Sequence, residues 1–181
     1  MATPLRIVGN LYREDDSVQQ FDIDELFRQY SGLVASLTYR ILGNMQDTED
    51  IVQEVFIDAQ KGVCRLRDAA AVKSWLATVA VRKSKRYLTR RRLLRVVGLD
   101  AAAQYHEVAD RSASPEQRSQ LASIYRMLDR FSADKRIAWV LRNVEGESMN
   151  QITTVLKCSR ATAHRWIAEV QGVIEEEFSD E

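Results

Sequence analysis

Asp47-Thr48-Glu49-Asp50-Ile51-Val52-Gln53-Glu54-Val55-Phe56-Ile57-Asp58-Ala59 is the stretch that decides the fold, because its apolar residues recur with the period of a helix. They stand at i, i+1, i+4, i+5 and i+8, starting at Ile51, and so share one face. Acidic residues and glutamine fill the opposite face and the first turn. We predict Asp47 as the N-cap of this helix, with Asp50 three residues on, because acids suit the positive helix N-terminus. Taken alone, the pattern fits an ordinary surface helix with a solvated acidic face better than it fits a binding surface.

The composition of the whole chain predicts an all-α protein. Its 181 residues suffice for one domain or two small ones, and only seven glycines and two prolines disfavour a turn-rich β protein. No apolar run is long enough to span a membrane and no signal-peptide core follows Met1, so we expect a soluble, cytoplasmic protein. Cys64 and Cys158 form no CxxC pair, and His106 and His164 are isolated, so we expect no metal site and no cofactor.

Charge is unevenly distributed along a chain whose net charge is zero. Residues 21–60 contain eight acids and two basic residues, whereas residues 82–95 contain eight basic residues and no acid. The basic run fits a solvated helix end, but eight cations without a counter-charge repel one another, and an anionic partner such as phosphate relieves that cost. We therefore predict two surfaces with different partners, one basic and one anionic. The segregation also predicts that the free protein can fold its two halves together, the acidic first half against a basic surface.

Helical periodicity and capping residues divide the chain into two small helical domains joined by a flexible linker. After an N-terminal lead-in over residues 1–21, we predict a domain over 22–95 whose helices end at Gly43-Asn44, near Gly62 and near Leu94. Residues 96–113 mix Gly, Ala, Asp and Ser without an apolar stripe, which predicts the linker. The second domain, over 114–181, begins with Ser114 as N-cap and Pro115 at the first helical position.

The last two predicted helices form a helix-turn-helix. Ser148 and Ser159 are suitable N-caps, and the turn lies over Lys157 to Ser159. Apolar residues from Ala163 to Ile174 keep helical spacing, which puts Arg165 at the centre of the outer face. An arginine beside small residues suits close approach to a DNA groove. An amphipathic helix hairpin packed on another protein fits the same spacing about equally well.

Two sets of residues together resemble a known family. Asp47-x-x-Asp50-x-x-Gln53-Glu54-x-Phe56, followed by Trp75-Leu76-x-x-x-Ala80, resembles region 2 of a bacterial RNA polymerase sigma factor. The run from Val144 to Ser148, with Ile152, Leu156, Ser159, Thr162 and Ile167, is similar to region 4 of the same family. By this ordered combination, from Asp24 to Ile174, the chain is identified as a member of the extracytoplasmic-function group (group IV of the sigma-70 family).

The resemblance implies an alternative sigma factor, not an enzyme, that binds core RNA polymerase at the largest-subunit clamp helices and the flap. It would direct initiation at promoter DNA by recognising −10 and −35 elements. The polymerase-binding residues implied are Asp47, Asp50, Gln53, Glu54 and Phe56. Those implied for −10 DNA are Arg65, Arg67, Lys73, Trp75, Arg82, Lys83, Arg86, Tyr87 and Arg90, with the loop from Arg65 to Val72 capturing a flipped base. Those implied for −35 DNA are Arg160, Ala161, Thr162, His164 and Arg165. An anti-sigma factor is a further implied partner, and no small-molecule substrate is expected.

Several residues depart from the family pattern, and each carries an expectation. Lys157 stands where the family often has Gly, which predicts left-handed strain or a different turn. Trp166 replaces a frequent Arg, and Glu169 lies toward the outer face, where it would repel phosphate, so we expect few −35 contacts. Arg82 and Arg86 stand where Asn or Asp is common, so the resemblance does not fix the preferred −10 sequence.

Two other classes of function compete with this hypothesis. A polymerase-independent helix-turn-helix regulator would dimerise on a palindromic site and would leave the acidic helix unexplained. An enzyme would need a nucleophile with a base, a glycine-rich phosphate loop or a metal-ligand cluster, and the sequence contains none of these patterns.

Overall fold

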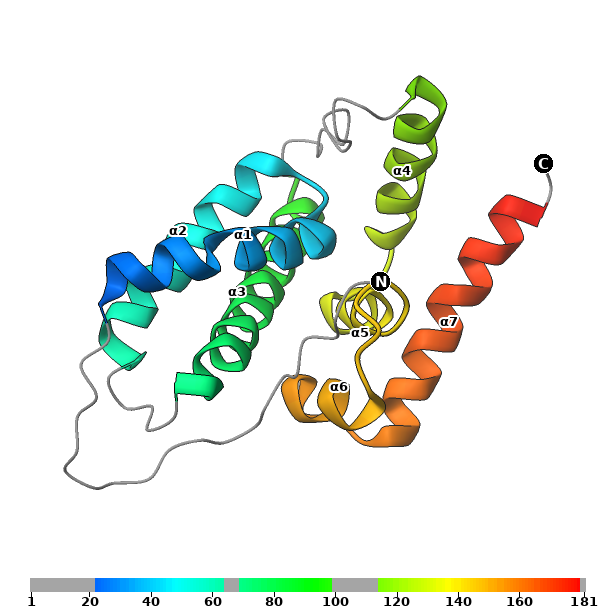
Figure 1. The fold of residues 1–181 in the computed structure, drawn as a ribbon. Coiled ribbons are helices and arrows are strands. Elements are labelled where there is room, and N and C mark those ends of the chain that lie inside the picture. Colours follow the sequence, from blue (N-terminus) through cyan, green and yellow to red (C-terminus); the bar gives the residue numbers. More distant parts are fainter. Residues whose placement is uncertain (1–21, 64–68, 99–113, 180–181) are drawn as a thin grey trace.

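The computed structural model describes residues 22–63, 69–98 and 114–179. These residues form seven helices and no strand (Figure 1), which confirms the all-α class. The helices are α1 (Ile23–Leu42), α2 (Met45–Gly62), α3 (Ala69–Val96), α4 (Pro115–Leu128), α5 (Ala133–Asn143), α6 (Met149–Leu156) and α7 (Arg160–Ser179). Among them, none combines the length and the apolar character needed to cross a bilayer.

The start of α2 differs from the sequence prediction by three residues. Gly43 ends α1 in the left-handed region, at φ +68°, and Asn44 then takes an extended conformation. In that conformation the Asn44 side chain accepts a hydrogen bond from the Asp47 backbone N–H at 3.0 Å, so Asn44 is the N-cap of α2. The prediction of Asp47 as N-cap was therefore wrong. The left-handed turn at Gly43 ends α1 and allows the next helix to begin at once, at Met45.

Helices α1, α2 and α3 form a bundle, which we call the first half. The five apolar residues that set the helical period of α2 are all buried, which confirms the predicted face. Burying each large aliphatic or aromatic side chain contributes about 1.5 to 3 kcal/mol. The N-terminal part of α3 is buried from Val72 to Val81, and its basic part follows and continues to Val96, past the predicted end near Leu94.

Helices α4 to α7, which we call the second half, begin at the capping residues that the sequence predicted. Ser114 and Ser148 form reciprocal capping boxes with Gln117 and Gln151, which satisfy backbone donors at the starts of α4 and α6. Of the two alternatives predicted for Lys157, the structure shows the left-handed one, since Lys157 has φ 54° and ψ 50° between α6 and α7. Helices α6 and α7 therefore form the predicted helix-turn-helix.

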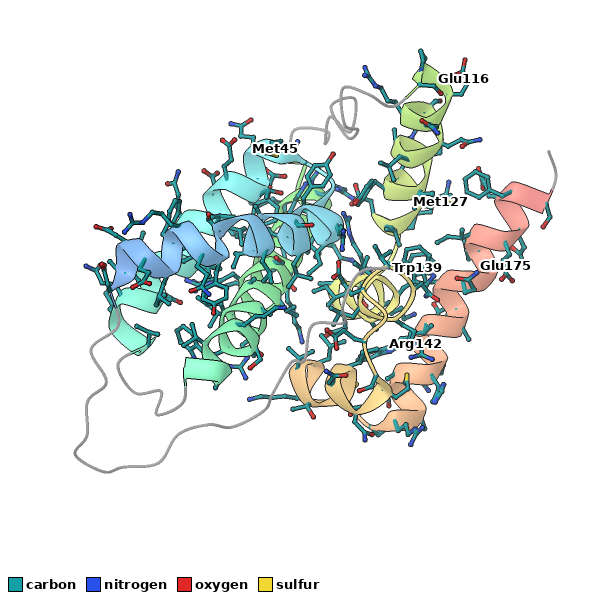
Figure 2. All side chains as sticks on the ribbon, in the orientation of Figure 1. Met45, Glu116, Met127, Trp139, Arg142 and Glu175 are labelled. Atoms are coloured by element: carbon teal, nitrogen blue, oxygen red, sulfur yellow. The ribbon has the colours of Figure 1, made fainter. Side chains whose placement is uncertain are left out.

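Helix α5 lies at the centre of the molecule, between α3 and α7 (Figure 1). Figure 2 labels Trp139 on α5, beside α7. The indole N–H of Trp139 donates to Gln171 of α7 at 2.7 Å. On its other side α5 contacts α3 and α1, so the buried apolar residues of both halves form one core. The halves do fold together, as predicted. The expected sense of the charges was wrong, because the first half supplies the cations and the second half the acids.

Candidate nucleic-acid and protein interfaces

The outer side of α2 carries an exposed acidic face. Asp50, Gln53 and Glu54 lie on it, opposite the buried apolar residues, as helical spacing requires. Ile57, one turn after Glu54, is 52% exposed and places an apolar side chain on this face, which the sequence analysis did not single out. Ile57 follows Asp50 by seven residues, about two helical turns, and this spacing predicts that both lie on the same face. We refer to these four residues as the acidic face.

Two residues predicted with the acidic face lie elsewhere. Phe56 is only 7% exposed and packs edge-on against Phe27 of α1, with ring centroids 4.9 Å apart. Asp47 is partly buried, and its carboxylate lies 3.7 Å from the Arg91 guanidinium of α3. The structure thus brings Asp50, Gln53 and Glu54 together, sets Phe56 beneath them and turns Asp47 toward α3.

Lys83 of α3 forms ion pairs that link α3 to α2 at the surface of the first half. Its ammonium lies 2.9 Å from Asp58 and 3.2 Å from Glu54, both on α2. Burial by itself lowers the pKa of Lys83, but the hydrogen bonds and charges of Asp58 and Glu54 outweigh burial and raise that pKa above its usual value. Lys83 is therefore a charged contact between α2 and α3 and is held away from free solvent.

The other cations of α3 divide between two sides of the helix. Lys85 and Arg95 pair with acids of the second half, and Arg91 with Asp47, so the predicted absence of counter-charges was wrong. A second group of exposed arginines stands at i, i+4 and i+8; we call Arg82, Arg86 and Arg90 the arginine stripe. Its members follow one another at about 6 Å along the helix axis. No acidic side chain among the described residues pairs with the stripe.

A hollow of about 480 Å³ lies between α2 and the arginine stripe. Its lining combines carbon surface with charge: Asp58, Lys61, Gly62, Trp75, Val79, Arg82, Lys83 and Arg86. Trp75 is 9% exposed, and its ring lies so close to Gly62 that a Cβ there would stand 2.9 Å from the indole. The indole therefore belongs to the core and also forms one wall of the hollow. Of the remaining residues predicted for −10 DNA, Lys73 and Tyr87 are half-buried, and Arg65 and Arg67 lie outside the described residues.

The outer face of α7 carries the residues that the sequence predicted for it. Arg160, Ala161, His164 and Arg165 are exposed, whereas Thr162 is half-buried. The Thr162 backbone N–H donates to Ser159 at 3.1 Å, which places Ser159 as the cap of α7. Glu169 pairs with Lys135 of α5, so part of the repulsion that we expected between Glu169 and phosphate is offset. In the described parts of the chain, no three acidic, histidine or cysteine side chains lie together as metal ligands would.

Comparisons with known proteins agree with this architecture. Residues 26–93, which span most of α1 to α3, match the family model of Sigma-70 region 2. The RNA polymerase sigma-H factor of Pseudomonas aeruginosa is 27% identical over 84% of this chain and 83% of its own. The ECF RNA polymerase sigma-E factor of Haemophilus influenzae is 28% identical over 88% of this chain and 90% of its own. ECF sigma factor SigE of Mycolicibacterium smegmatis is 32% identical over 74% of this chain and 52% of its own.

A solved structure shares the fold. The sigma factor RpoE of Bartonella quintana, in a co-crystal with the anti-sigma factor NepR, matches with a TM-score of 0.62 and 18% identity over 87% of this chain and 97% of that one. The family match assigns the bundle of α1 to α3 to Sigma-70 region 2. The relatives that are similar along most of this chain are named sigma-H and ECF sigma-E factors.

Proposed function

We propose that this chain is an alternative sigma factor that binds core RNA polymerase and directs initiation at promoters with −10 and −35 elements. The observation that carries the proposal is the separation of two charged surfaces on one region 2 bundle, the acidic face on α2 and the arginine stripe on α3. The chain would act by binding and would catalyse no reaction itself. It would work in the cytoplasm, beside the polymerase and the chromosome.

The acidic face suits a basic helical partner, which we propose to be the clamp helices of the largest polymerase subunit. Asp50, Gln53 and Glu54 would form a polar rim around Ile57, since interfaces commonly combine an apolar centre with a polar edge. Phe56 would support this face from beneath and Asp47 would lie at its margin. The charges would speed encounter, and burial of Ile57 would contribute to affinity.

The arginine stripe and the hollow suit an opened −10 strand. Cations about 6 Å apart can follow the phosphates of a single strand, and the wall formed by Trp75 offers a flat surface beside them. Lys73, Lys83 and Tyr87 would border this strand, and the loop with Arg65 and Arg67 would complete its binding. Holding an unstacked base costs a few kcal/mol, which such contacts can offset.

The exposed face of α7 would bind the −35 element in the major groove. Arg160 and Arg165 would contact phosphate or guanine, Ala161 would allow close approach, and His164 and Thr162 would add polar contacts. The second half would also contact the polymerase flap. We propose domain limits of 22–95 and 114–181, a lead-in over 1–21 and a linker over 96–113.

An anti-sigma factor is a further proposed partner. The fold match to RpoE, whose co-crystal contains the anti-sigma factor NepR, supports this proposal. Such a partner would cover the acidic face and so exclude the polymerase.

The test is in vitro transcription with purified core polymerase, combined with polymerase pull-down. Reversing charge at Asp50→Lys with Glu54→Lys should abolish pull-down and transcription and leave the helical circular dichroism unchanged, because both side chains are exposed. The matched control is Glu176→Lys with Glu177→Lys on α7, which changes net charge equally on an exposed face elsewhere. A wild-type chain that binds a palindromic DNA site as a dimer and never associates with the polymerase would support the regulator instead.

A further inference from the structure

The C-terminal end of α1 is capped by a side chain from the other half of the molecule. Arg136 of α5 is 2% exposed and donates from Nε to the Ile41 carbonyl at 2.7 Å and from Nη2 to the Leu42 carbonyl at 2.8 Å. The last four carbonyls of a helix have no partner within that helix, so α1 takes these partners from α5. The third arm of the guanidinium, Nη1, donates to Asp129 at 2.6 Å, and this acid balances its charge.

Tyr125 of α4 fits the same corner of α1. Its hydroxyl donates to the Arg40 carbonyl at 3.1 Å, and the Arg136 guanidinium lies 5.4 Å from its ring centroid. A Cβ on Gly43 would stand 2.4 Å from the Tyr125 ring, so only glycine allows this approach. The left-handed glycine that ends α1 therefore also makes room for the second half.

Three ion pairs surround this contact, and all three have the cation on the first half and the acid on the second half. Lys85 of α3 lies 2.6 Å from Asp134, Arg95 lies 3.1 Å from Asp129, and Arg40 of α1 lies 2.8 Å from Glu145. In each pair the first half gives the cation and the second half the acid. Lys85 and Arg95 belong to the same basic run as the arginine stripe, so acids of the second half occupy cations of α3 that would otherwise face phosphate.

The closed arrangement also fixes the distance between the two proposed DNA-binding helices. Helix α5 lies between α3 and α7, and packed helix axes are about 8 to 10 Å apart, so α3 and α7 are separated by roughly 20 Å. The −10 and −35 elements are about 25 base pairs apart, which is roughly 85 Å along the duplex. The closed molecule cannot bind both elements at once.

We infer that the surface formed by Tyr125, Asp129, Asp134, Arg136 and Glu145 is an intramolecular docking site for α1 and α3 that competes with promoter DNA. Its occupant is the first half of the same chain, identified by three complementary ion pairs and the capped helix end. The three ion pairs across the contact are electrostatic, so salt and polyanions such as DNA weaken them. Both therefore shift the molecule toward the open form. The docking contact stands on the structure alone, and its competition with promoter DNA rests on the proposed function.

Charge reversal and charge exchange test the docking contact in the full chain. Asp134→Lys with Glu145→Lys should open the molecule, since each new lysine faces a cation of the first half. The radius of gyration from small-angle X-ray scattering should then rise by about 8 Å, as expected when one compact body becomes two bodies about 40 Å apart. Adding Lys85→Asp and Arg40→Glu restores opposite charges across the contact and should return the radius to the wild-type value.

Binding of a single-stranded oligonucleotide, followed by fluorescence anisotropy, gives the second measurement. The opened variant should bind about 5- to 10-fold more tightly than the control Glu176→Lys with Glu177→Lys, which adds the same charge away from the contact. An unchanged radius in the reversed variant, with helical content intact, would overturn the docking inference even if the chain initiates transcription. Opening of a chain that neither binds polymerase nor selects promoters would instead overturn the proposed function and leave the docking contact standing.

Discussion

The two halves of this molecule differ in where they keep their charges. The first half displays most of them on its surface, with acids on α2 and arginines on α3, and its interior is mainly apolar. The second half buries two ionisable side chains almost completely, Arg136 at 2% exposure and Glu147 at 0%. Exposed charges cost little stability and are available for partners, whereas buried charges affect folding directly. We therefore expect substitutions in the first set to change binding and those around the second set to change stability.

The two buried groups also differ from each other. Arg136 has partners for all three arms of its guanidinium, and two of these are carbonyls of α1. Neither carboxylate oxygen of Glu147 has a hydrogen-bond partner. The second half thus depends on the first half to satisfy Arg136, and it contains an acid that no neighbour satisfies.

The largest effect is expected where the two halves meet. Gly43→Ala should lower the free energy of unfolding by about 3 to 4 kcal/mol, because a left-handed alanine is strained and its Cβ meets the Tyr125 ring. Gly146→Ala is the matched control, since Gly146 also has a positive φ, +72°, but has open space around its Cβ position. This variant should lose about 1 kcal/mol of unfolding free energy, through backbone strain alone. Urea unfolding of both variants measures the difference. Equal losses would mean that the close fit of Tyr125 contributes nothing.

Glu147 should make the second half sensitive to pH. Burial, and then repulsion from Glu145, raises the pKa of Glu147 from 4.5 to about 7. The folded chain therefore holds this proton more tightly than the unfolded chain, and its contribution to stability is fully present below about pH 4.5 and lost as pH rises to about 7. Glu147→Gln should be more stable than the wild type by on the order of 3 kcal/mol above pH 7.

The measurement for Glu147 is urea unfolding of both proteins at several pH values. The difference in unfolding free energy should shrink toward zero at pH 4.5 and stay constant above pH 7. Asp24→Asn, which removes an exposed acid at the start of α1, serves as the control for the loss of one negative charge. A constant difference across the range would contradict the shifted pKa of Glu147.

The exposed charges of the first half should act on binding. Replacing the arginine stripe by alanine should weaken binding of a single-stranded −10 oligonucleotide about 100-fold and lower the salt slope by about 2. Its unfolding free energy should change by less than about 0.5 kcal/mol per site, since all three side chains are exposed. Lys85→Gln with Arg95→Gln should change the affinity for the same oligonucleotide less than about threefold. In the wild type these two side chains must give up acids of the second half before they can contact phosphate, so they add little net affinity. Similar losses in both variants would mean that α3 does not have two functionally distinct sides.

The smallest effect is expected on α7. Arg165→Ala should weaken binding of a −35 duplex and lower the salt slope by about 1 if Arg165 contacts phosphate. Because Arg165 is exposed, the unfolding free energy should stay unchanged. Fluorescence anisotropy across a salt series measures the slope, and Arg126→Ala, an exposed arginine on α4, is the control. An unaltered slope would remove Arg165 from the DNA contacts.

The sequence by itself determined the helices, most of their caps and the resemblance to sigma factors. The apolar period of α2 and the capping serines of α4 and α6 act within one helix or over three or four residues, so local pattern is sufficient to predict them. The exposed residues of α2 and α7 follow from the same period. The cap of α2 was missed because Asn44 and Asp47 are both good N-caps, and only the glycine turn before them decides between the two.

Tertiary structure alone decided which charges are paired and which remain available. Arg136 finds its carbonyl partners 94 and 95 residues away, and Arg40 finds Glu145 at a separation of 105 residues. No local pattern distinguishes Lys85, which pairs across the junction, from Arg86, which belongs to the stripe. Ion pairs depend on which side chains are brought within about 4 Å, and that is settled only when the two halves pack around α5.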